Sequence, residues 1–186
     1  VGAAWIALNA WSALFVFLGA FFYAIVYTVW LKRRTWLNIV FGGLAGSWAV
    51  LAGAAAADPQ LGAVPLALAF VLFLWTPPHF WSLAIAFRED YKAAGVPMLP
   101  VVVGDQRAAQ TIFYSTLALV AASFLPLAFG LGPIYAIGAA TGGFLFIQKA
   151  WLLAQEPTRK TAMACFFSSL VQLTLVLLAA IIDARF

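Results

Sequence analysis

The chain has 186 residues, of which 66% are hydrophobic and only 9% are charged. Soluble domains carry about 25% charged residues, so this composition excludes an ordinary soluble domain and predicts a membrane protein with several spans. The formal net charge is +4 and each basic group abuts an apolar run, which excludes a nucleic-acid-binding surface. The single cysteine, Cys165, excludes an intrachain disulfide.

Six apolar runs follow one another along the chain. Each is long enough to cross about 30 Å of hydrocarbon as a helix, and all are too long and too uniformly apolar for the strands of a membrane barrel. The sequence therefore predicts the all-α class, a polytopic helical bundle in the lipid bilayer. The expected spans cover roughly residues 5–30, 38–57, 62–87, 108–129, 133–153 and 161–182.

The basic residues predict how these spans are oriented. Nine of the ten lysines and arginines fall in or beside the first, third and fifth connections. Alternate connections lie on the same side of a membrane, and short connections rich in Lys and Arg stay in the cytoplasm. We therefore expect these three connections to face the cytoplasm.

Residues 75–104 are the stretch in which we expect the chemistry. Pro77 and Pro78 lack N–H donors, so two preceding carbonyls lose their helical partners. This predicts a broken helix with Thr76 as the N-cap of a new half-helix, or else a simple kink. His79, the only histidine, follows inside the span. Its candidate roles are a haem-iron ligand, an acid or base, or a hydrogen-bond donor to substrate, and the alternative is a hydrogen-bonded core histidine.

An acidic pair, Glu89 and Asp90, follows the third span and lies between Arg88 and Lys92. Carboxylates beside basic residues can bind Mg²⁺ and a diphosphate together, although a charge cluster at a helix end is more often a solvated turn. Neighbouring residues on a helix point about 100° apart, so at most one of the two carboxylates would face a shared ion comfortably.

A basic group, Lys32, Arg33 and Arg34, is expected on the same side of the membrane. It either anchors the orientation of the chain or binds phosphate opposite Asp90. In the second span, Gly42 and Gly46 form a G-x-x-x-G pair. These glycines favour close helix packing or, alternatively, a wall thin enough for a bulky ligand to lie against.

Three segments resemble one family when they are taken together: YTVWLKRRTWLNIVFGGLAG (residues 27–46), LWTPPHFWSLAI (residues 74–85) and EDYKAAGVPMLPVVVG (residues 89–104). In this order and spacing they resemble the protohaem IX farnesyltransferases, which are UbiA-type membrane prenyltransferases. The resemblance covers essentially the whole chain. One departure follows Gly46, where this family commonly has a Pro-Pro pair and this chain has Ser47-Trp48-Ala49-Val50.

The family has about nine spans, and this chain resembles the last six. We therefore expect residues 1–186 to form a single transmembrane prenyltransferase domain without its N-terminal third, which in the family carries a first Asn/Asp-rich motif. The resemblance implies an integral protein of the bacterial inner membrane. It also implies haem A synthase or oxidase assembly proteins as partners.

The reaction that the resemblance implies is transfer of a farnesyl group from farnesyl diphosphate to a vinyl group of haem B, giving haem O, with Mg²⁺ as cofactor. For the metal we predict Asp90 and Glu89, and for catalysis Asp90 and His79. The residues predicted to bind the diphosphate are Lys32, Arg33, Arg34, Arg88 and Lys92. Those predicted to surround the haem and the prenyl group are Asn38, Gly42, Gly43, Trp75, His79, Phe80, Trp81 and Tyr91. A haem-binding protein without transferase activity and a transporter fragment are the alternatives.

Overall fold

The structure is a computed structural model that describes residues 1–184, and in that range every regular element is a helix. The elements in chain order are α1 (Gly2–Ala7), α2 (Ala10–Phe21), the π-helix η1 (Phe22–Leu31), α3 (Asn38–Ala57), α4 (Ala63–Ala86), α5 (Arg88–Ala93), α6 (Leu99–Val103), α7 (Asp105–Ala122), the 3₁₀-helix η2 (Leu125–Phe129), α8 (Pro133–Gln155) and α9 (Arg159–Asp183). Six helical stretches are long and apolar enough to span a membrane. The predicted all-α class is confirmed.

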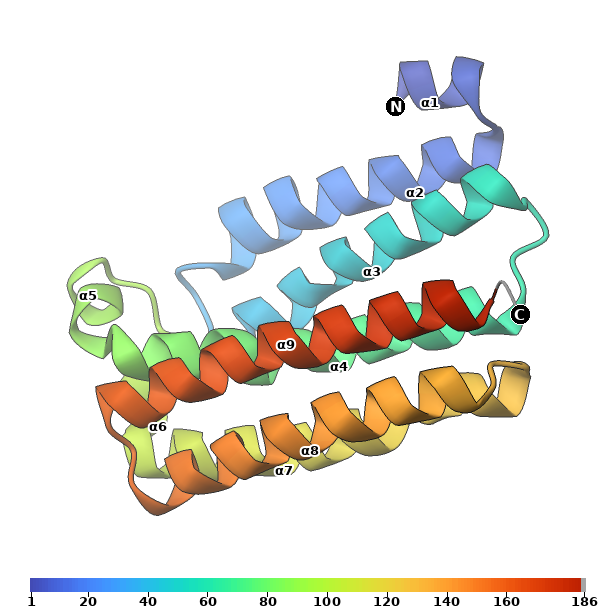
Figure 1. The fold of residues 1–186 in the computed structure, drawn as a ribbon. Helices are drawn as coiled ribbons and strands as arrows, with labels where there is room; N and C mark the ends of the chain where they lie inside the picture. The colour runs from blue at the N-terminus through green and yellow to red at the C-terminus, as the bar shows by residue number, and fades with distance from the viewer. Residues whose placement is uncertain (185–186) are drawn as a thin grey trace.

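Helix α4 lies at the centre of the bundle (Figure 1). It packs against α3 on one side and against α7 and α9 on the other, while α8 completes the second side by packing on α7 and α9. The α8–α9 contact depends on small residues, because a Cβ added at Gly138 would lie 2.5 Å from the Cβ of Ala179. Helix α4 thus joins a layer formed by α2, η1 and α3 to a layer formed by α7, α8 and α9.

The predicted break of the third span at Pro77 and Pro78 is wrong. Helix α4 continues through both prolines, which are buried, and ends at Ala86. The prolines remove two helical hydrogen bonds, but neighbouring helices pack against both sides of α4 and hold its backbone in place. Thr76 is not an N-cap, since its hydroxyl donates to the carbonyl of Leu72 inside the same helix, at 2.9 Å.

The first predicted span, residues 5–30, is not one helix. It is divided at Leu8 and Asn9, where the side chain of Asn9 accepts a hydrogen bond from the N–H of Ser12 and so caps α2. The Asn9 amide also donates to the carbonyl of Ala55 at 2.6 Å, which ties α2 to α3. Apolar composition alone could not reveal this division, because the short helix α1 is as apolar as the span that follows.

The other spans are close to their predicted limits, and the second, residues 38–57, matches at both ends. The fourth begins earlier, at Asp105, and its main helix ends at Ala122 before the short η2. The fifth and sixth extend a few residues beyond the apolar runs. Helices continue into the membrane interface with polar residues, so hydropathy marks only their hydrocarbon portion.

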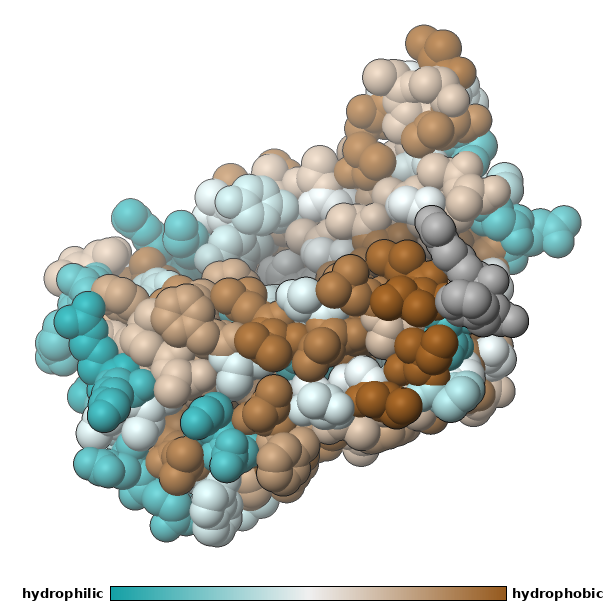
Figure 2. Space-filling model, in the orientation of Figure 1, coloured by the Kyte–Doolittle hydropathy of each residue, from teal (hydrophilic) through white to brown (hydrophobic). Residues whose placement is uncertain are grey.

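The predicted grouping of the basic connections at one end of the bundle is confirmed. The end of η1, the helices α5 and α6, and the α8–α9 connection all lie at the same end (Figure 1). Hydrophilic residues gather at this end on the face shown in Figure 2, while apolar residues cover most of the flank. The structure therefore has the polar end and apolar belt of an integral membrane protein.

Candidate active site

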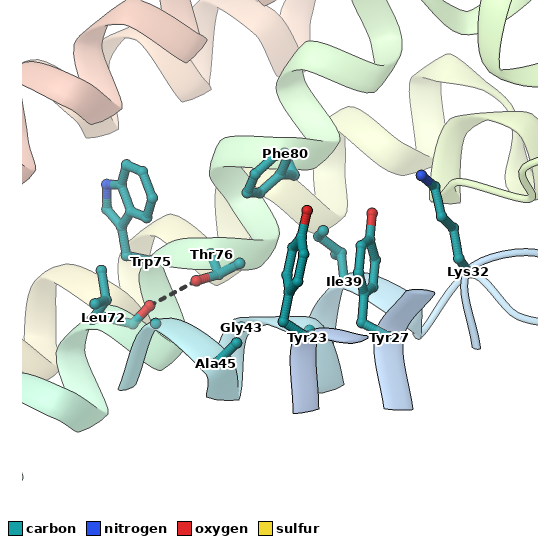
Figure 3. A pocket seen from close by; sticks show the side chains of 12 residues that line it. Tyr23, Tyr27, Lys32, Ile39, Gly43, Ala45, Leu72, Trp75, Thr76 and Phe80 are labelled. Atoms are coloured by element: carbon teal, nitrogen blue, oxygen red, sulfur yellow. Dashed lines mark hydrogen bonds between the residues drawn. The ribbon is translucent and has the colours of Figure 1, made fainter. Parts of the chain in front are cut away.

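An apolar cavity of about 370 Å³ lies between η1, α3 and α4 (Figure 3). Its lining residues are Tyr23, Tyr27, Lys32, Ile39, Gly42, Gly43, Ala45, Gly46, Leu72, Trp75, Thr76 and Phe80. Five of these were predicted as site residues from the sequence: Lys32, Gly42, Gly43, Trp75 and Phe80. The cavity has one cationic residue, Lys32, at the edge nearest the polar end of the bundle (Figure 3).

Two adjacent glycines of α3 give the cavity its shape. A Cβ added at Gly43 would lie 2.9 Å from the Cβ of Thr76, so this glycine lets α3 and α4 approach closely. A Cβ added at Gly42 would lie 2.9 Å from the ring of Tyr27, so that glycine makes room for the tyrosine. Of the G-x-x-x-G pair, Gly42 thus borders the cavity beside Tyr27 and Gly46 contacts Leu72 at an ordinary distance, whereas the close helix packing occurs at the neighbouring Gly43.

Sequence reasoning missed Tyr23 and Tyr27, whose rings stand side by side in the cavity with centroids 6.0 Å apart (Figure 3). Both belong to the π-helix η1, in which the N–H of Lys32 donates to the carbonyl of Tyr27 five residues earlier, at 2.8 Å. π-helical turns are rare and often occur at functional sites. Tyr27 lies in the first of the three family-like segments, and this was the available signal.

Trp75 is held in the cavity wall by α9. Its indole N–H donates to the carbonyl of Ser169 at 2.9 Å. The ring of His79 stacks on that of Trp75 at 4.0 Å, and Phe166 stacks on His79 at 4.5 Å. His79 is 5% exposed and is not among the residues that line the cavity. It therefore lies in the layer next to Trp75, between α4 and α9.

The hydrogen bonds around Ser169 indicate the tautomer of His79. The Ser169 hydroxyl donates its one proton to the carbonyl of Phe166 at 2.6 Å. Its oxygen also lies 2.7 Å from Nδ1 of His79, so it must accept there and Nδ1 must carry the proton. We assign this tautomer from the network. The arrangement is that of a hydrogen-bonded core histidine, the alternative considered from the sequence.

A second hollow, of about 400 Å³, adjoins the cavity through the shared residue Lys32. Asp90 and Tyr91 of α5 lie in its wall, together with Phe87, Ala94 and Val96. Burial raises the pKa of Tyr91, so its phenol stays neutral and can donate a hydrogen bond at neutral pH. The apolar cavity and a hollow with an acidic residue thus share one lysine in their walls.

A third, smaller hollow of about 260 Å³ contains Arg33 and Lys92 and shares Val96 with the second. Arg88 instead forms an ion pair with Asp105 at 3.6 Å, where both side chains are about one-third exposed. Such a pair contributes little to stability. It does, however, direct the Arg88 guanidinium toward the start of α7.

The remaining predicted site residues lie around these hollows. Arg34 and Glu89 are exposed and line none of the three. Asn38 is fully buried, and its amide donates to the carbonyl of Lys32 at 3.0 Å, which fixes the connection from η1 to α3. Trp81 is buried against Trp36, with ring centroids 6.2 Å apart, and does not reach the cavity.

The described residues contain no group of three or more His, Cys, Asp or Glu side chains that could enclose a metal ion. Asp90 is the one acidic residue in the walls of the three hollows. Mg²⁺ in enzymes is commonly bound by one or two carboxylates, with phosphate oxygens and water completing its coordination. Among these wall residues Asp90 is therefore the candidate protein ligand for a metal shared with a phosphate substrate.

Sequence comparisons match this chain to membrane prenyltransferases. The model of the UbiA prenyltransferase family matches residues 1–171. Protoheme IX farnesyltransferase 2 of Paramagnetospirillum magneticum is 58% identical over 183 residues, which are 98% of this chain and 64% of that protein. Protoheme IX farnesyltransferase 1 of Cenarchaeum symbiosum is 44% identical over 183 residues, 98% of this chain and 62% of that protein. The chain therefore spans less than two thirds of the length of these relatives.

One solved structure, from work on digeranylgeranylglyceryl phosphate synthase in membranes, superposes with a TM-score of 0.80 at 23% identity. The superposition covers 96% of this chain and 63% of that one, and it shows the likeness of the fold. The family match extends from the first span to the middle of α9 and so includes every element around the cavity. The chain belongs to the UbiA prenyltransferase family.

Proposed function

We propose that this chain carries the prenyl-donor site of a protohaem IX farnesyltransferase, which transfers a farnesyl group from farnesyl diphosphate to a vinyl group of haem B to give haem O. The observation that supports it is that an apolar cavity and a hollow that contains Asp90 share Lys32 in their walls. A prenyl diphosphate has this same polarity, an apolar tail joined to an anionic head. Haem B is proposed as the acceptor because relatives at 44–58% identity are named protoheme IX farnesyltransferase.

In this proposal the diphosphate lies at the mouth of the cavity. The Lys32 ammonium neutralises phosphate charge, and Arg33 and Lys92 add positive charge from the adjoining hollow. Asp90 would be a protein ligand for Mg²⁺ there, and the metal would neutralise the leaving group as the C–O bond breaks. The mouth of the cavity lies on the cytoplasmic side of a bacterial inner membrane. The water-soluble diphosphate is released on that side.

The apolar cavity would shield the reacting carbon. When the C–O bond breaks, its electron pair leaves with the diphosphate and an allylic cation remains, which water would capture in an open site. The rings of Trp75, Phe80 and Tyr27 face this cavity and can stabilise a cation through their π faces (Figure 3). The vinyl group of haem B then supplies the electron pair of the new C–C bond, and water adds to the carbon left cationic.

No specific observation favours the two alternative functions. The transporter hypothesis was based on a broken helix within the membrane, but α4 is continuous. A haem-binding protein without transferase activity would have no use for the hollow whose wall contains both Asp90 and Lys32.

The proposal is tested by changing Asp90→Asn in the complete gene product, expressed in a host without its own haem O synthase. We expect haem O formation in isolated membranes to fall by at least about a hundredfold, because losing the carboxylate that would hold the metal removes stabilisation of the leaving group in the transition state. Glu156→Gln, at an exposed acidic residue of the α8–α9 connection, is the matched control. Haem O formation by Asp90→Asn equal to that of the control, in excess Mg²⁺, would exclude the proposed role.

A further inference from the structure

Leu72 of α4 lies at the end of the cavity away from Lys32 (Figure 3), and Gly46 of α3 is also among the lining residues. Gly46 follows Asn38, the first residue of α3, by eight positions, which is about 12 Å along the helix axis. A Cβ built at Gly46 would lie 3.4 Å from Cδ2 of Leu72, an ordinary van der Waals distance. The Leu72 side chain therefore covers the backbone of Gly46.

Beyond this point α3 and α4 are joined directly. The hydroxyl of Ser47 donates to the carbonyl of Ala69 at 2.9 Å, and both residues are buried. This hydrogen bond holds α3 against α4 one residue beyond Gly46.

We propose that Leu72 and Gly46 form a floor that limits the length of the prenyl chain this protein accepts. The inference rests on the proposed function in one respect, namely that a prenyl diphosphate occupies the cavity. The anionic head is fixed at Lys32 by charge, so the tail must extend toward the other end. A chain longer by one five-carbon unit would have to displace the Leu72 side chain or leave the cavity sideways into lipid.

Two substitutions change the floor in opposite directions. Leu72→Ala removes the side chain that covers Gly46 and should deepen the cavity. Gly46→Ala adds a methyl group at ordinary contact distance from Leu72, so the helices need not move, but the cavity becomes shallower. Gly53→Ala is the matched control, since it is the same change on the same helix at a position with nothing within 4 Å of the added atom.

The experiment compares geranyl, farnesyl and geranylgeranyl diphosphate as donors, in membranes that contain the complete gene product and excess haem B. Adding or removing one apolar group in a hydrophobic pocket changes an enzyme's preference between two substrates of different size by about tenfold or more. We expect Leu72→Ala to raise the use of geranylgeranyl relative to farnesyl diphosphate by about tenfold. We expect Gly46→Ala to lower the use of farnesyl relative to geranyl diphosphate by a similar factor, and Gly53→Ala to change neither ratio.

Direct binding of the same three diphosphates to purified protein without haem separates this inference from the proposed function. If the variants bind the three diphosphates in shifted ratios but no prenylated haem is formed, the result would support the floor and contradict haem as the acceptor. Unchanged ratios in both Leu72→Ala and Gly46→Ala, with wild-type haem O formation intact, would overturn the floor alone and indicate that the tail leaves sideways. Binding of none of the three by the wild type would overturn both.

Discussion

At the scale of single residues, His79 shows how packing decides between roles that the sequence leaves open. It is the only histidine, it lies within a membrane span, and such residues are functional candidates by default. In the structure its two faces are covered by Trp75 and Phe166, and its Nδ1 is bonded to Ser169. These contacts make it a support for the aromatic wall of the cavity, and a direct catalytic role stays a prediction.

Replacing His79 tests this support. His79→Ala removes a stacked ring between Trp75 and Phe166 and leaves a cavity between α4 and α9, which costs about 3–5 kcal/mol for a buried aromatic. His79→Phe keeps a ring in the stack, and Ser169 can still donate to Phe166. We expect haem O formation to fall more in His79→Ala than in His79→Phe, and farnesyl diphosphate binding to change less than turnover.

The measurement is the rate of haem O formation and the affinity for farnesyl diphosphate in detergent, for variants that keep the wild-type elution volume. A His79→Phe protein that binds farnesyl diphosphate normally but forms no haem O would contradict the supporting role. It would indicate instead that the imidazole itself takes part in the reaction.

At the scale of elements, α8 and α9 are tied together by Asp183, the last residue of α9. Its carboxylate accepts hydrogen bonds from the N–H groups of Gly132, Ile134 and Tyr135, at the start of α8. The first N–H groups of a helix have no partner within the helix, and an anion also interacts favourably with the positive end of the helix dipole. One carboxylate thus caps a neighbouring helix and fixes the register of the pair.

Removing this cap should lower stability measurably. We expect Asp183→Ala to reduce the free energy of unfolding by about 1–2 kcal/mol, the usual range for loss of an N-cap. Asp58→Ala is the control, because its carboxylate caps only an exposed turn at Gln60. Thermal unfolding in detergent, followed by circular dichroism, checks this, and equal midpoints for the two variants would show that the Asp183 contacts contribute nothing.

At the scale of the whole molecule, the cavity has walls from η1, α3 and α4, and its outer wall is thin. Only 6% of the first membrane span is buried, and Tyr23 is 62% exposed. An allylic cation requires a site closed to water, and a metal held by Asp90 alone would bind weakly. The related proteins are about half as long again as this chain.

We therefore expect residues 1–186, expressed alone, to insert into the membrane but to form no haem O. Separated pieces of helical membrane proteins can reassemble through packing, so co-expression with the preceding part of the gene should restore activity if such a part exists. Haem O analysis of membranes from a host without its own synthase checks this. If these residues alone formed haem O, the result would show that the reaction needs neither a second acidic residue nor a closed cavity wall.

The sequence by itself determined the all-α membrane class, the approximate limits of most spans and the grouping of the basic connections at one end. Hydropathy and charge report these features directly, because the bilayer sorts residues by polarity along its normal. Residue types in local motifs also identified the family, and three of the residues predicted for its site, Lys32, Gly42 and Trp75, line one cavity.

Only the tertiary structure decided which apolar residues face the cavity, which face lipid and which are packed between helices. Tyr23 and Leu72 line the cavity, whereas Trp81 and His79 do not. In a soluble helix the polar side marks the surface, but lipid is as apolar as the protein core, so periodicity carries little of this information. The continuity of α4 through its prolines was decided in the same way, by the helices packed on both its sides.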